Sequence, residues 1–220
     1  MDPTTTDGGA RVRVWDAPVR IVHWLLVLLI AVSWWTAEQE MMDWHYRSGL
    51  TILGLVVFRI VWGVIGSSTA RFAGFVRGPR GIVDYLRGRS EFVLGHNPLG
   101  ALSVLALLAM VAVQVGLGLF AADEDGIDSG PLSHLIDGDL SEDIAGWHET
   151  GFKLLLALVA LHVAAILFYL LVKRRNLVGP MVTGTAPAPE GARPMERAGP
   201  PRFLAAVLIA AAAVYFIANA

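Results

Sequence analysis

The 220-residue sequence contains no cysteine. It therefore has no disulfide, no thiolate metal site, no cysteine nucleophile and no covalently attached c-type haem. Charged residues make up only 16% of the chain. No Gly-rich phosphate loop, nucleophile elbow or H-E-x-x-H zinc motif is present. Instead, hydrophobic residues make up 55% and the mean hydropathy is +0.58, which places the protein in the membrane class and favours no nucleic-acid partner.

Five apolar runs predict helices that cross a bilayer. They cover residues 19–36, 48–65, 99–121, 144–172 and 203–217. A spanning helix needs about 20 mainly apolar residues, and the fifth run is short and rich in alanine. We therefore expect an all-α integral membrane protein with a four-helix transmembrane bundle and one appended C-terminal transmembrane helix.

The domain organisation follows from these runs and from a Pro-, Gly- and Ala-rich stretch near the C-terminus. We expect a tail (1–13), a transmembrane domain (14–183), a flexible linker (184–202) and a C-terminal transmembrane helix (203–220). The loop "RFAGFVRGPRGIVDYLRGR" mixes apolar and basic residues. It is expected to lie on the membrane surface against anionic headgroups.

Basic residues lie mainly on one side of the predicted helices. They gather in 11–20, 71–89 and 173–175, whereas the loop "AADEDGIDSGPLSHLIDGDLSED" is acidic. The positive-inside rule places the N-terminus and the basic segments in the cytoplasm, and the acidic loop in the periplasm of a Gram-negative cell. The predicted location is the bacterial inner membrane, crossed several times.

Polar residues mark the expected helix starts. Asp16 with Pro18, and Asn97 with Pro98, are typical of a helix N-cap followed by an early proline. Ser141 and the acidic residues after it are expected to cap the helix over 144–172.

Four histidines lie in or beside the predicted helices. His148 and His162 are fourteen residues apart, which is about 21 Å and some 40° short of four turns, so both point to one face. By depth, His45 is expected to face His148, and His23 to face His162. A lone histidine in a membrane is usually a hydrogen-bonded core residue, but four at two matching depths predict axial ligation of two b-type haems. His96 and His134 lie in loops and are expected to be ordinary polar residues.

Arg59 lies fourteen residues after His45 and therefore shares its helix face. A buried arginine needs a counter-charge, and the propionates of the inner haem would supply one. Glycines on the same helices would either let a flat macrocycle approach the backbone or allow close helix packing.

The chain resembles the prokaryotic di-haem cytochromes b that include the b-type subunit of nickel–iron hydrogenases. The resemblance rests on "VWDAPVRIVHW", "HYRSGLTILGLVVFRIVWG", "FVRGPRGIVDYLRG", "GHNPLG" and "GWHETGFKLLLALVALHVAAIL", over roughly residues 14–183. It implies that His23 and His162 ligate the inner haem iron, that His45 and His148 ligate the outer one, and that Arg59 contacts a propionate. Through "GHNPLG" it also implies a role for His96 at the inner haem or a quinone.

The resemblance implies electron transfer through two haem b groups, between the quinone pool and a periplasmic partner. That partner is a hydrogenase subunit or a c-type cytochrome, and the quinone is expected beside the inner haem. Two alternatives stay open. A stand-alone superoxide:quinone oxidoreductase predicts a positively charged cavity beside the outer haem, to which Arg47 and Lys153 could contribute. A histidine-based proton or metal transporter predicts no haem at all.

Overall fold

The structure is a computed structural model that describes residues 11–89, 95–187 and 194–220. Its elements are β1 (Arg11–Arg13), α1 (Ala17–Glu38), α2 (Met42–Ile65), α3 (Phe72–Phe75), α4 (Pro79–Leu86), α5 (Pro98–Phe120), a short 3-10 helix (Ser133–Leu135), α6 (Gly138–Leu171), α7 (Val178–Thr183), β2 (Thr185–Pro187) and α8 (Pro200–Ala218). Residues 1–10 of the expected tail and 188–193 of the expected linker lie outside the described residues.

Within the described residues, five helices are long and apolar enough to cross a membrane. They are α1, α2, α5, α6 and α8. Large apolar side chains such as Leu161 and Phe216 stay exposed on their outer surfaces, as expected where hydrocarbon rather than water is the solvent. The predicted all-α membrane fold is confirmed.

Side-chain caps start two of these helices where the sequence predicts. The Oδ1 atom of Asp16 accepts a hydrogen bond from the backbone amide of Val19 at 2.9 Å, and Oδ1 of Asn97 accepts one from Gly100 at 2.7 Å. Each cap is followed by a proline in the first turn, whose missing amide hydrogen costs nothing there.

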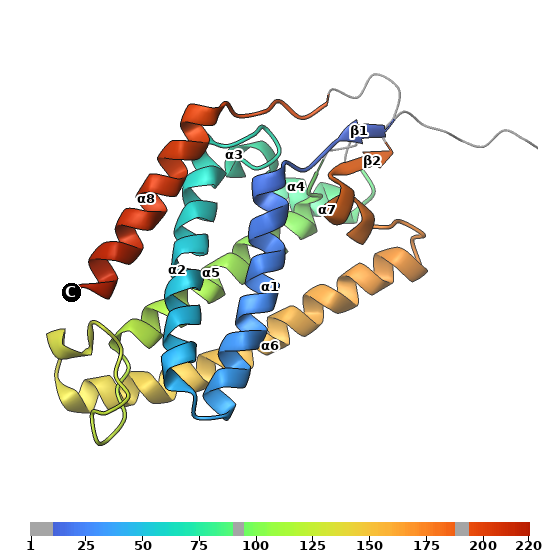
Figure 1. Ribbon diagram of the computed structural model, residues 1–220. Helices are drawn as coiled ribbons and strands as arrows, with labels where there is room; N and C mark the ends of the chain where they lie inside the picture. Colours follow the sequence, from blue (N-terminus) through green and yellow to red (C-terminus); the bar gives the residue numbers. More distant parts are fainter. Residues whose placement is uncertain (1–10, 90–94, 188–193) are drawn as a thin grey trace, which may run out of the picture.

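The predicted cap at Ser141 is wrong. Asp137 caps α6, and its carboxylate accepts a hydrogen bond from the amide of Asp139 at 3.0 Å. Ser141 lies inside the helix and donates to the carbonyl of Phe120 at 2.5 Å. Because the cap and not the apolar run sets the start, α6 has 34 residues and is about 50 Å long. In Figure 1 it crosses the bundle obliquely.

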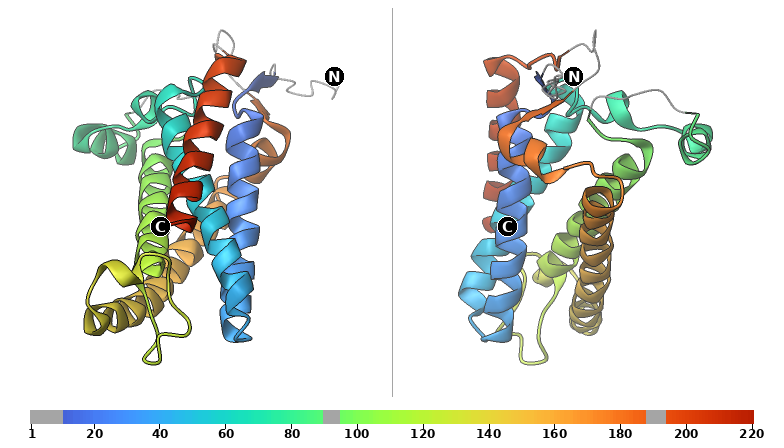
Figure 2. Two further views of the ribbon diagram at one scale, coloured as in Figure 1. Left: turned by 60° about the vertical axis from the view of Figure 1, so that its left-hand side comes forward. Right: turned by 90° about the vertical axis from the view of Figure 1, so that its right-hand side faces the viewer.

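The long helices form two hairpins. α1 packs along α2, and α5 packs along α6, while α2 and α5 make the main direct connection between the hairpins. α8 packs against α2 on the outside, so it is an appended helix. Figure 2 shows α1, α2 and α8 on one side and α5 and α6 on the other.

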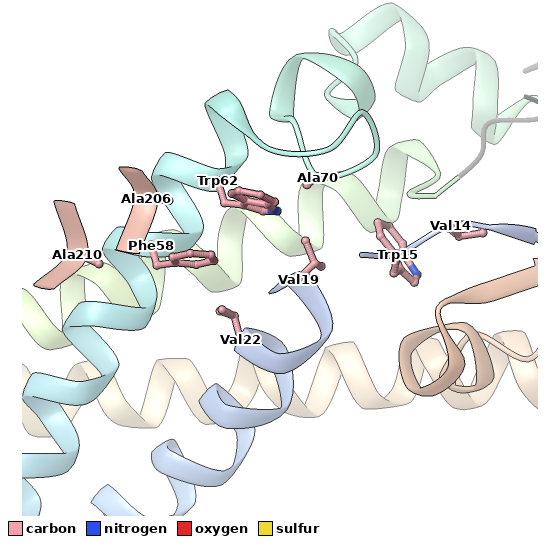
Figure 3. Close-up of a cluster of buried hydrophobic side chains, with 9 residues drawn as sticks. All are labelled: Val14, Trp15, Val19, Val22, Phe58, Trp62, Ala70, Ala206 and Ala210. Atoms are coloured by element: carbon pink, nitrogen blue, oxygen red, sulfur yellow. The ribbon is translucent and has the colours of Figure 1, made fainter. Parts of the chain in front are cut away.

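Two apolar clusters hold this arrangement. One joins α2, α5 and α6 in the middle of the bundle through the buried side chains of Ile52, Val56, Val111 and Leu155. The other, shown in Figure 3, joins α1, α2 and α8 to the segment before α1, and it includes Phe58, Trp62 and Ala206. Trp62 also donates its indole hydrogen to Oδ2 of Asp16 at 2.8 Å.

The end of the bundle that carries residues 11–20, 71–89 and 173–175 is called the basic end, and the end that carries the loop 121–137 is the acidic end. At the basic end β1 pairs with β2 in antiparallel register. Beyond β2, Met195 is buried and donates its amide hydrogen to the carbonyl of Arg13 at 3.1 Å. This hydrogen bond ties the described part of the expected flexible linker to the segment before α1.

Candidate functional site

His45 and His148 approach each other from the two different hairpins. His45 lies on α2 and His148 on α6, their ring centres are 6.0 Å apart, and the ring planes are nearly perpendicular at 87°. An imidazole nitrogen bonds a metal at about 2 Å and lies about 1 Å from its ring centre, so two axial imidazoles on one ion have centres about 6 Å apart. The observed separation fits one metal ion between the rings.

Backbone carbonyls orient both rings. Nδ1 of His45 donates to the carbonyl of Ser33 at 2.8 Å, and Nδ1 of His148 donates to the carbonyl of Gln114 at 2.9 Å. The Gln114 side chain donates back to the carbonyl of His148 at 2.8 Å. A histidine that donates from Nδ1 keeps its Nε2 lone pair for a metal, so both rings are held in the ligating tautomer.

Glycines shape the space around this pair. A Cβ atom on Gly118 would lie 2.9 Å from Cε1 of His148, so α5 approaches the ring only because this position lacks a side chain. Gly49 lies one turn after His45 on α2, and a Cβ there would have no neighbour within 4 Å. Gly54 and Gly63 instead face Val214 and Phe72 in close packing, so the glycines divide between the two expected roles.

His23 of α1 and His162 of α6, the other expected pair, lie nearer the basic end. Leu155, which is 2% exposed, lies between His148 and His162 on α6, within the apolar cluster in the middle of the bundle. His23 and His162 are close enough for their charges to interact. Nδ1 of His162 is 3.2 Å from the hydroxyl of Ser103, and Nδ1 of His23 is buried without a partner in the described structure.

Arg59 is buried at the basic end of α2 and is 7% exposed. Its guanidinium makes one long hydrogen bond, 3.4 Å, to the carbonyl of Ala70, and it lies 4.9 Å from the ring centre of Phe72. It forms no ion pair with a carboxylate of the described residues. A buried cation in this setting is suited to an anionic ligand group.

His96 lies beside this region, between two aromatic rings. Its ring centre is 4.5 Å from that of Trp15 and 4.6 Å from that of Phe75. Burial, and to a lesser extent the positive charges of Arg59 and His162, lowers the pKa of His96 to about 3. Its Nδ1 atom and the buried hydroxyl of Ser67 have no hydrogen-bond partner in the described structure. By contrast, His134 is exposed on the 3-10 helix.

The histidine side chains supply two ligands per pair, which suits a metal that is already bound in the plane of a macrocycle. Among the described residues, no three His, Asp or Glu side chains gather as a site for a bare metal ion. Each pair instead offers two imidazoles from opposite hairpins, which is the axial set of a haem iron. The unpaired polar atoms of His23, Ser67 and His96 and the cation of Arg59 offer partners for polar groups of a bound cofactor.

Three of these groups are absent from the sequence-based prediction. Gln114 is the one polar amide in the apolar run over 99–121, and its burial in a membrane helix signals a partner. Ser103 offers a weaker signal of the same kind. The carbonyl of Ser33 offers none, because every residue has a carbonyl.

Five helices that are long and apolar enough to cross a membrane define a multi-pass membrane protein, with histidines in its interior. The family model described as "Prokaryotic cytochrome b561" matches residues 14–184. The chain therefore belongs to this family and is a membrane electron-transfer cytochrome of the b type, which carries haem b. This confirms the family expected from the sequence motifs.

Curated relatives point the same way. A probable Ni/Fe-hydrogenase B-type cytochrome subunit of Azotobacter chroococcum is 26% identical over 82% of this chain and 92% of its own length. Proteins of similar name from Escherichia coli K12 and Cupriavidus necator are each 24% identical, over 78% and 83% of this chain and 88% and 93% of their own lengths. No solved structure matches the chain.

Proposed function

We propose that this protein is the membrane subunit that carries electrons from a hydrogenase, through two b-type haems, to the quinone pool. The observation that carries the proposal is the pair of imidazoles at 6.0 Å, His45 and His148, with both Nδ1 atoms tied to backbone carbonyls. A second pair lies nearer the basic end of the same two hairpins. When bound, each haem supplies a one-electron couple, while the chain sets ligation, spacing and dielectric.

We assign His45 and His148 to the outer haem, and His23 and His162 to the inner one. Leu155 and the apolar cluster around it separate the two levels, so the low-dielectric layer between them excludes water. Arg59 holds a propionate of the inner haem, because it is the buried cation of that level and makes only one weak hydrogen bond within the described structure. The same cation favours the reduced haem, whose net charge is more negative.

We place the basic end in the cytoplasm, so the N-terminus is cytoplasmic and the acidic end faces the periplasm. Asp123, Glu124 and Asp125 are exposed in the loop of the acidic end. They offer a docking surface for a basic patch on the electron donor. The names of the relatives favour a hydrogenase as this donor over a c-type cytochrome. The quinone binds at the inner haem edge, where the buried polar atoms of Ser67 and His96 lack partners in the described structure.

The outer surface gives little support to superoxide oxidation. Of the two cations expected near the outer haem, Lys153 is paired with Glu149 at 2.7 Å, and the guanidinium of Arg47 lies 5.5 Å from the ring centre of Trp44. Lys153 is neutralised in part by Glu149, which weakens the positive cavity that this alternative predicts. The histidine pairs favour haem binding over metal-ion transport. A bare metal ion would need a third ligand, and neither pair has one among the described residues.

The proposal is tested by reconstituting the purified protein into liposomes together with a nickel–iron hydrogenase. Hydrogen should reduce both haems, and added quinone should then reoxidise them. The variant His148→Ala should abolish the transfer while the hydrogenase still reduces a soluble dye. If hydrogen leaves the haems oxidised and superoxide reduces them instead, the protein is the stand-alone oxidoreductase.

A further inference from the structure

A small open cavity lies at the basic end, between α4 and the end of α6. Its volume is about 290 Å³, and it is lined by Tyr85, Gly88, Tyr169, Lys173 and Arg175. This volume is near the lower end of small-molecule sites, which are roughly 300–1,000 Å³. No part of the cavity is formed by the histidine pairs or by Arg59, so it is separate from the electron-transfer site.

A hydrogen-bonded chain builds one wall of the cavity. The amide of Asn97 donates to the hydroxyl of Tyr169 at 3.1 Å, and the hydroxyls of Tyr169 and Tyr85 are 2.6 Å apart. Burial and this hydrogen bond raise the pKa of Tyr85 to about 12, so its hydroxyl stays protonated at neutral pH. The two hydroxyls share one hydrogen bond but carry two hydrogens, so one O–H remains free to donate into the cavity.

Two cations form the other wall. After α6 ends, Arg174 adopts a left-handed conformation with φ of 52°, which is disfavoured for a residue other than glycine. The chain thereby turns back, and the amide of Arg175 donates to the carbonyl of Tyr169 at 2.8 Å. The turn brings the charge of Arg175 close enough to act on Tyr85 of α4. Neither Lys173 nor Arg175 pairs with a carboxylate of the described residues.

The position of the cavity decides between a soluble and a membrane ligand. It lies directly beyond Leu171, the last residue of a membrane-spanning helix, where lipid headgroups meet water. Exposed apolar side chains flank it, since Leu86 of α4 is 66% exposed and Leu171 is 72% exposed. In the right-hand view of Figure 2, α4 lies beyond the end of α5. Acyl chains of a ligand could therefore cover Leu86 and Leu171 while its headgroup enters the cavity.

We propose that this cavity binds the phosphate of an anionic phospholipid, with Lys173 and Arg175 as charge partners and the free tyrosine O–H as a hydrogen-bond donor. Such a lipid fixes α4 to the end of α6 at the membrane surface. The interaction is more specific than the general attraction of basic loops to anionic headgroups, because two cations and one hydroxyl line the same small cavity.

The test measures lipid binding to the full-length, haem-loaded protein in detergent by native mass spectrometry. Dioctanoyl-phosphatidylglycerol and dioctanoyl-phosphatidylcholine are titrated separately. We expect one site that prefers the anionic lipid. The double variant K173Q/R175Q should weaken its dissociation constant at least tenfold, and Tyr85→Phe should weaken it less. The matched control R197Q/R202Q removes two exposed arginines at the same end and should leave the dissociation constant unchanged.

Three results would overturn the proposal. Equal binding of both lipids would show that the headgroup charge is not recognised. An equal loss in R197Q/R202Q would show that the effect is general surface charge. Inorganic phosphate that competes at the same concentration as the lipid would show a soluble anion site. The haem spectrum of each variant reports whether the bundle still folds, and Tyr85→Phe keeps the test valid if the double variant does not.

Discussion

The substitution Gly118→Ala tests whether His148 binds a metal without removing any ligand. The new Cβ would lie 2.9 Å from Cε1 and 3.3 Å from Nδ1 of His148. Non-bonded carbons prefer about 3.5–4.0 Å, so the ring must move by roughly 0.6–1.1 Å. Overpacking of this kind costs about 1–3 kcal/mol, which equals about 5- to 150-fold weaker haem binding at the outer site.

The matched control is Gly116→Ala, two residues earlier on α5, where a Cβ would meet no atom within 4 Å. Both variants gain the same helix propensity, about 1 kcal/mol, so their difference isolates the contact with His148. Titration of the haem-depleted protein with haemin, followed by absorbance, gives the affinity of each site. Equal outer-site affinities in the two variants would show that His148 does not ligate the haem.

Three further predictions follow from the same geometry. His45→Ala and His148→Ala should each remove the same haem and leave the other, as shown by haem content and redox titration, and two haems retained in both would refute the pairing. Arg59→Leu should lower the potential of the inner haem by on the order of 60 mV, because a cation that favours the reduced form is lost. The potential of the outer haem should stay constant. An unchanged inner potential would exclude the propionate contact. Tyr85 has a folded-state pKa of about 12, against about 10 when unfolded, so the unfolded state loses its proton first and stability should fall between pH 10 and 12. Thermal unfolding should show a shallower fall in Tyr85→Phe than in Tyr215→Phe, and equal slopes would show that folding does not raise the pKa of Tyr85.

The sequence predicts those parts of the fold that depend on local chemistry. Asp16 and Asn97 were identifiable as caps because each precedes a proline and an apolar run, and both act as caps. The start of α6 was not identifiable, because Asp137 and Ser141 are both good capping residues. Only the folded structure shows that Ser141 instead donates its hydroxyl hydrogen to the carbonyl of Phe120. The pairing of β1 with β2 joins residues far apart in the sequence, and neither strand has a hydrophobic alternation that would reveal it.

For the candidate site, helix periodicity and depth suffice to place His45 opposite His148, and the structure brings their rings together. Their role as ligands stays a prediction, as does that of His23 and His162. Residue counts overstate the depth of His162, because α6 starts early and runs obliquely. The partners of the imidazole Nδ1 atoms depend on helix packing, and only Gln114 and, more weakly, Ser103 left a signal in the sequence.

The haem content of the purified protein tests whether two separate pairs of histidines bind haem. The pyridine haemochrome assay gives haem b per polypeptide, and a potentiometric titration resolves the centres. Two separate pairs of histidine ligands should give two haems per chain and two one-electron waves. A single haem, or a single wave that disappears in both His45→Ala and His23→Ala, would contradict ligation by two separate pairs of histidines.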